Sequence, residues 1–229
     1  MPFTQTEIDD TNNHLIAAAF EGQVEHTVKP AVSGRGDYIA RVMRGGMPLA
    51  LAQGSESARV RCFQGHVRHA IARDAGELRR IGHNSDLRGV LARTAGQTGS
   101  LLNIDKVAAD VKPSWGTTFD YISLLESLFL VKRLPAWGVT VLPRTLKTPK
   151  IHVVDSGIGA YLMQLSTDKM RRADPAALTE FGHLLESFVV QEVLRQTDWM
   201  DSPVTDRDPT NKNVTSMTPP HSTRHPRHR

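Results

Sequence analysis

The chain has 229 residues, of which 39% are hydrophobic and 23% are charged, with a formal net charge of +4. This is an ordinary globular composition with enough apolar residues for a core. The longest apolar runs, "LIAAAF" and "SLFLV", are far shorter than the ~20 residues that span a bilayer, and the acidic start "MPFTQTEIDD" lacks a signal-peptide core. We therefore expect a cytoplasmic protein with no membrane partner.

The single cysteine, Cys62, excludes an intramolecular disulfide and a thiolate zinc cluster. The first 30 residues carry five acidic side chains and one lysine, Lys29, so the positive charge is concentrated further along the chain. A basic middle region is compatible with an acidic partner such as nucleic acid, although moderately basic surfaces are common.

The first third of the chain predicts helices. Residues 11–22 predict one helix. In "DYIARVMRGGMPLAL", the pair Gly45 and Gly46 predicts the end of a helix and Pro48 the start of the next turn. "SDLRGVLARTAG" predicts a further helix with Ser85 as its N-cap.

A long helix is predicted between residues 57 and 81. Its apolar residues recur at intervals of three, four and seven and line one face: Val60, Phe63, Val67, Ile71, Leu78 and Ile81. Asp74 occupies a position on this face. We interpret it as a buried or interface carboxylate paired with a cation, with a catalytic carboxylate as the alternative.

Residues 99–145 follow the element order of a winged helix-turn-helix. A short helix is predicted at 104–110 and an amphipathic helix at 115–128, followed by a strand at 129–134 and a second wing strand in "VTVLP". The core stripe of the longer helix is predicted to contain Phe119, Ile122, Leu125 and Phe129.

The helix at 115–128 carries only Asp120 and Glu126 as charged residues, whereas a helix that reads a DNA groove is rich in Arg, Lys, Asn or Gln. Cations follow it and could contact phosphate: Lys132, Arg133, Arg144, Lys147 and Lys150. Two interpretations stay open, DNA contact through these cations and a winged helix used for packing or for binding a protein.

Residues 149–196 predict a strand and two helices. After the strand "KIHVV", Asp155 or Ser156 can cap a helix at 157–165. The apolar residues of "FGHLLESFVVQEVLRQ" cover most of the helix circumference, which predicts burial nearly all round. Glu186 and Glu192 fall among them, so they are candidates for a site or a salt bridge.

Residues 201–229 are rich in Pro, Thr, Arg and His and predict a disordered tail. We interpret His221, His225 and His228 as part of a flexible basic tail rather than a metal site. Because such a tail cannot cover the apolar helix before it, we expect self-association through that helix.

Six stretches stand in a fixed order: "PFTQTEID", "RGGMPLAL", "IARD", "YISLLESLFLVKRLPAW", "PKIHVVDSGIGAYLM" and "GHLLESFVVQEVLRQ". Together they resemble the bacterial and archaeal AAA ATPases that carry a C-terminal domain of unknown function 4143, which is related to restriction-endonuclease-like folds. The resemblance implies a mainly α chain with small β content. It divides the chain into a helical lid-like region (1–98), a winged helix (99–145), a partial α/β C-terminal domain (146–200) and the tail (201–229).

Full-length relatives of this kind bind ATP and Mg²⁺, but no G-x-x-x-x-G-K-[ST] occurs in these 229 residues. We therefore expect no cofactor, no resident metal and no enzymatic activity, in a member truncated at both ends. The resemblance implies that Asp155, Glu186 and Glu192 are remnant carboxylates of the nuclease-like domain. It also implies that Arg73 and Asp74 contacted the ATPase core.

Three hypotheses follow from these observations: an inactive, truncated ATPase-family member, a winged-helix module that binds DNA or protein, and a metal-dependent nuclease. The last is the least favoured, since a metal site of that type needs acidic residues from further strands.

Overall fold

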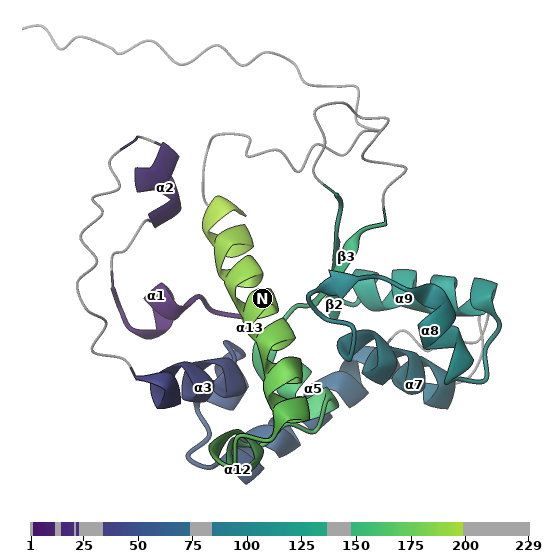
Figure 1. Ribbon diagram of the computed structural model, residues 1–229, viewed down its shortest axis with the longest axis horizontal. Coiled ribbons are helices and arrows are strands. Elements are labelled where there is room, and N and C mark those ends of the chain that lie inside the picture. The colour runs from purple at the N-terminus through teal and green to yellow at the C-terminus, as the bar shows by residue number, and fades with distance from the viewer. Residues whose placement is uncertain are drawn as a thin grey trace, which may run out of the picture.

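The computed structural model describes residues 2–11, 15–20, 22, 34–73, 84–136 and 148–198 (Figure 1). This part of the chain is mostly helical and contains one three-stranded antiparallel sheet, which confirms the expected mainly α class with small β content. Among the residues described, none of the helices is both long and apolar enough to span a membrane.

The N-terminal segment begins with α1 (Gln5–Ile8), whose start is fixed by a capping box. The Glu7 N–H donates to Thr4 Oγ1 (3.2 Å), and the Thr4 N–H donates to Glu7 Oε2 (2.7 Å). The next helix, α2 (Leu15–Phe20), lies inside the range 11–22 that the sequence predicts.

The glycine and proline signals of "RGGMPLAL" have the predicted effect. Helix α3 (Arg35–Arg44) ends at Gly45, which has φ +66°, a left-handed conformation that glycine adopts without strain. Pro48 then begins the short helix α4 (Pro48–Leu51), where its missing N–H costs no hydrogen bond.

Two helices follow, α5 (Glu56–Arg73) and α7 (Asn84–Ala95). The predicted apolar face of α5 is confirmed at Phe63, Val67 and Ile71, which are buried, whereas Val60 is exposed. Leu78, Ile81 and Asp74 lie outside the described residues. Ser85 lies inside α7 rather than at its N-cap, because the helix already begins at Asn84.

After α7 the elements are β1 (Ser100–Leu101), α8 (Ile104–Ala109), α9 (Trp115–Ser127), β2 (Val131–Leu134) and β3 (Lys150–Val153). Helices α8 and α9 and strand β2 lie where the sequence predicts two helices and a strand. The antiparallel sheet has the order β1-β3-β2, with Val131 opposite Val153 and Leu134 opposite Lys150. The predicted second strand "VTVLP" lies outside the described residues, and β3 is the strand that pairs with β2.

The core under the sheet is made by α5, α7, α8 and α9. On α9, Ile122 and Leu125 are fully buried as predicted, but Phe119 is 40% exposed and Phe129 is 67% exposed, so their assignment to the core is wrong. The buried face of α9 is instead completed by Thr118, Tyr121 and Leu124. Phe129 has φ +56° just after the helix ends, in a turn that leaves its side chain in solvent.

The C-terminal part consists of α11 (Ser156–Leu162), α12 (Thr167–Arg171) and the long helix α13 (Pro175–Asp198), which form a second core with α3. The prediction that α13 is buried nearly all round is wrong. Its buried residues follow a single stripe at helical spacing: Ala177, Phe181, Leu184, Ser187, Gln191 and Arg195. Val189 and Val193 are exposed, because the described neighbours of α13 cover one side of it (Figure 1).

Candidate functional site

Among the described residues, Asp155 has the most buried carboxylate, and it is 1% exposed at the N-terminus of α11. As predicted, it caps this helix, since the Ile158 N–H donates to Asp155 Oδ1 (2.9 Å). The Gly46 N–H, far away in the sequence, donates to Asp155 Oδ2 (2.7 Å). Burial raises the pKa of Asp155, and the N–H donors and Arg195 oppose this effect. Asp155 therefore joins the glycine turn after α3 to the start of α11.

Glycine is required where these two turns meet. A Cβ on Gly45 would collide with the Asp155 carboxylate, and a Cβ on Gly157 would lie 2.5 Å from Phe63 Cζ and 2.9 Å from the Arg44 carbonyl oxygen. The two stretches "RGGMPLAL" and "DSGIG" thus contain glycine because their backbones pack directly against each other.

Glu192 belongs to a second buried network with Arg195. Arg195 is 8% exposed and donates to the carbonyl oxygens of Phe3 (3.0 Å) and Val154 (2.8 Å). Glu192 accepts from the Gln5 N–H (2.8 Å) and lies 3.5 Å from Arg195. Burial raises the pKa of Glu192. The predicted carboxylate is therefore part of a clamp that holds the N-terminal segment against α13.

Glu186 lies on the side of α13 that faces away from its buried residues. It pairs with Lys150 at 2.5 Å, and both side chains are 42% exposed. Next to this pair is a buried polar chain that sequence analysis did not detect. His152 Nδ1 lies 2.9 Å from Ser187 Oγ, which in turn lies 2.7 Å from Thr98 Oγ1. His152 is fully buried, its Nε2 has no hydrogen-bond partner among the described residues, and burial lowers its pKa.

The three predicted carboxylates have different hydrogen-bond partners. Asp155 binds backbone N–H groups, Glu186 binds Lys150, and Glu192 binds Gln5 and Arg195. Within the described ranges, no group of three His, Cys, Asp or Glu side chains is arranged to hold a metal ion. The observed roles of these carboxylates are capping and ion pairing.

The exposed face of α9 is aromatic. Trp115 and Phe119 are one helical turn apart and stack with their ring centroids 5.8 Å apart and their planes 8° from parallel. The Arg133 guanidinium lies 5.6 Å from the centroid of the Phe119 ring. It is held there by Glu126, whose carboxylate accepts from Arg133 Nε (2.6 Å) and from the Arg133 backbone N–H (2.9 Å).

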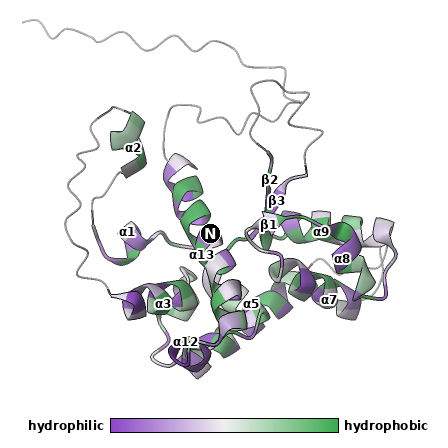
Figure 2. Cartoon of the chain, in the orientation of Figure 1, coloured by the Kyte–Doolittle hydropathy of each residue, from purple (hydrophilic) through white to green (hydrophobic). Residues whose placement is uncertain are grey.

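This face continues into a groove. At spacings of four, four and three residues, Trp115, Phe119, Ser123 and Glu126 form one line along α9. Ser123 and Glu126 also line a cavity of about 1060 Å³ that extends across the sheet to α13. We call this cavity the α9–α13 groove, and its apolar walls include Leu101, Phe129, Leu134, Val193 and Leu194. Figure 2 shows hydrophobic residues along the visible face of the C-terminal half of α13.

The predicted nucleic-acid contacts are not gathered on a free basic surface in the described part of the chain. Arg133 and Lys150 are each paired with a glutamate, and Lys132 also has an interaction partner. Arg144 and Lys147 lie outside the described residues. Arg73 is the last residue of α5, and the predicted inter-domain partner Asp74 lies outside the described ranges.

Comparison with known proteins places the chain in a family that is described as a domain of unknown function. Residues 35–169, more than half of the chain, match the family model described as "Domain of unknown function (DUF8612)". The chain therefore belongs to this family. The curated proteins include no match to the chain, and neither do the solved structures.

Proposed function

We propose that this member of the DUF8612 family is a non-catalytic, cytoplasmic interaction module of the winged-helix type, in which α9 binds protein rather than DNA. The observation that carries the proposal is the exposed face of α9, where the stacked Trp115 and Phe119 stand beside an arginine that is already neutralised by Glu126.

The winged-helix assignment rests on element order and sheet order. The elements follow the order α7, β1, α8, α9, β2 and β3. In the antiparallel sheet the last strand, β3, lies between β1 and β2. In such a module the helix that precedes the last two strands is the one that presents side chains to a partner. In this chain that helix is α9.

Several features favour a protein partner over DNA. The charged residues of α9 are the acids Asp120 and Glu126, and the nearby cations Arg133 and Lys150 are tied to carboxylates. Exposed Trp and Arg side chains are typical of the energetic centre of protein interfaces. The adjoining α9–α13 groove is mainly apolar, as expected for a surface that is covered on binding.

We infer that the partner is a second copy of this chain. One face carries both a ridge, Trp115 and Phe119, and an apolar groove bordered by Phe129 and Val193. Two copies related by a twofold axis can each place the ridge in the groove of the other, because a twofold interface is self-complementary.

Sedimentation velocity tests this proposal over a series of protein concentrations. We expect concentration-dependent dimerisation that is weakened at least about tenfold by Trp115→Ser with Phe119→Ser, and separately by Val193→Asp, since each change removes buried apolar contact. Leu49→Ser, at a residue of α4 that is 73% exposed, is the matched control and should leave dimerisation unchanged.

A monomer at all concentrations would overturn the proposed self-association. Fluorescence anisotropy with duplex DNA tests the alternative. Affinity that falls steeply between ~50 mM and ~200 mM salt would instead support phosphate contacts.

We further propose that the module is related to the AAA ATPase family with the C-terminal domain of unknown function 4143, as an inactive member. The order of the six sequence landmarks supports this relation, and the lack of a phosphate-binding loop supports the absence of activity.

A further inference from the structure

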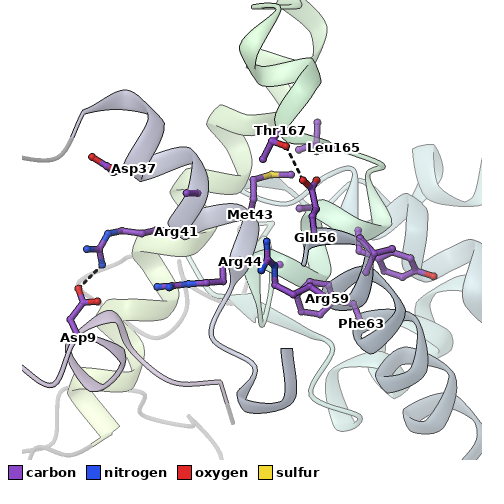
Figure 3. Close-up of a pocket in the computed structure, with 15 residues that line it drawn as sticks. Asp9, Asp37, Arg41, Met43, Arg44, Glu56, Arg59, Phe63, Leu165 and Thr167 are labelled. Atoms are coloured by element: carbon purple, nitrogen blue, oxygen red, sulfur yellow. Dashed lines mark hydrogen bonds and ion pairs between the residues drawn. The ribbon is translucent and has the colours of Figure 1, made fainter. Parts of the chain in front are cut away.

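A second cavity, of about 310 Å³, lies between α3, α5 and α11 (Figure 3). Its apolar wall includes Met43, Phe63 and Tyr161, and three arginines, Arg41, Arg44 and Arg59, also line it. This size is at the lower end of the range for small-molecule sites. The cavity shares no residue with the α9–α13 groove.

The three arginines differ in how well they are satisfied. Arg41 donates to Asp9 Oδ2 (2.5 Å) and to Gln5 Oε1 (3.0 Å). In the described structure, the Arg59 side chain has a single hydrogen bond, of 3.3 Å, to the Gln53 carbonyl oxygen. The Arg44 side chain makes no hydrogen bond or ion pair with the described residues, and its Nε is buried without a partner among them. In Figure 3 the guanidinium groups of Arg44 and Arg59 carry no dashed line.

The three acids that line the cavity have partners other than Arg44 and Arg59. Asp9 pairs with Arg41, Asp37 accepts from the Gly34 N–H (2.9 Å) at the start of α3, and Glu56 accepts from the Thr167 hydroxyl (2.8 Å). Within the described ranges, no carboxylate forms an ion pair with Arg44 or Arg59. Two half-buried cations that line one cavity thus have no carboxylate partner in the described part of the chain, so an anion that reaches them would gain charge-assisted hydrogen bonds.

We propose that this cavity binds a small organic acid through a single carboxylate, which accepts hydrogen bonds from Arg44 and Arg59 while its apolar body rests on Phe63, Met43 and Tyr161. Guanidinium groups match the planar geometry of a carboxylate. A more highly charged ligand is disfavoured because Asp37 and Glu56 also line the cavity and would repel it.

The proposal goes beyond the interaction function and does not depend on it. All residues named as ligand contacts fall within residues 35–169, the part of the chain that defines the family.

Benzoate and its neutral isostere benzamide are the probes, titrated into the ¹⁵N-labelled full chain while amide chemical shifts are followed by NMR. We expect benzoate to shift the amides of Gly157 and Tyr161 and to bind at least tenfold more tightly than benzamide. Arg44→Gln should remove this preference for the anion. Arg171→Gln, at an arginine whose side chain is 82% exposed on α12, should retain it.

Arg59→Gln serves as a second variant in case Arg44→Gln does not fold, and it should reduce the preference in the same way. Inorganic phosphate should shift these amides more weakly than benzoate. The proposal is overturned if benzoate and benzamide bind equally, if the shifts map away from the cavity, or if neither arginine variant changes benzoate affinity.

Discussion

At the scale of single residues, we expect His152 to make the stability of the protein depend on pH. It is fully buried, its Nδ1 contacts Ser187 Oγ, and no described residue offers its Nε2 a partner, so a proton on Nε2 has no acceptor in the described structure. Burial lowers its pKa from 6.5, with Glu186 opposing and Lys150 reinforcing the effect. Below pH 6.5 the unfolded chain therefore binds more protons than the folded chain, and acidification lowers the free energy of unfolding.

We expect the free energy of unfolding to decrease as the pH is lowered through 6.5, and the histidine to contribute up to ~1.4 kcal/mol per pH unit. His152→Asn should flatten this dependence. Urea unfolding at a series of pH values measures both. A slope that is unchanged in His152→Asn would show that other groups cause the pH dependence.

At the scale of elements, we expect alanine substitution of two helical glycines to change stability in opposite directions. A Cβ at Gly157, in the first turn of α11, would lie 2.5 Å from Phe63 Cζ and 2.9 Å from the Arg44 carbonyl oxygen, whereas a Cβ at Gly182 in α13 would meet nothing within 4 Å. We expect Gly157→Ala to lower the free energy of unfolding by roughly 1–3 kcal/mol through overpacking. Gly182→Ala should raise it by roughly 0.5–1 kcal/mol, since alanine favours the helix.

Melting temperatures of the two alanine variants provide the comparison, and the expected shifts differ in sign. If Gly157→Ala melted at or above the wild-type temperature, the close packing of α11 against the turn after α3 would be wrong.

Local signals account for the elements that the sequence predicts well. Gly45 and Pro48 separate α3 from α4, Asp155 caps α11, and the spacing of Ile122 and Leu125 places the buried face of α9. The errors concern tertiary contacts. Hydrophobicity alone could not show that Phe119 and Phe129 stay exposed or that α13 is covered on one side, because both depend on which elements pack nearby.

The candidate sites were harder to predict for the same reason. Arg44 and Arg59 come from different helices, and the chain from Thr98 through Ser187 to His152 joins three distant segments. No spacing along the sequence relates these residues. Glu186 and Glu192 both form ion pairs, which is the salt-bridge alternative of the prediction, but burial explains the need for a partner only at Glu192, because Glu186 is 42% exposed.

At the scale of the whole molecule, the proposed lack of catalysis makes a prediction about nucleotides. The 229 residues contain no phosphate-binding loop, and the arginine-lined cavity also presents Asp37 and Glu56, which disfavour a polyanion. Isothermal titration with ATP and with ADP in the presence of Mg²⁺ should therefore show no binding, with a phosphate-loop ATPase as the positive control. Stoichiometric binding at micromolar nucleotide would contradict the proposal.

The clamp at Arg195 also affects how the chain folds as it is synthesised. The side chain of this residue binds the carbonyl oxygen of Phe3, 192 positions away in the sequence, and Glu192 binds the Gln5 N–H. A ribosome adds about 5–20 residues per second. The interval between synthesis of the N-terminal segment and synthesis of Arg195, which binds it, is therefore roughly 10–40 s. Contacts of such long range also slow folding. During that interval the segment is open to proteases and chaperones, and the native arrangement of this part of the molecule can form only after α13 has left the ribosome.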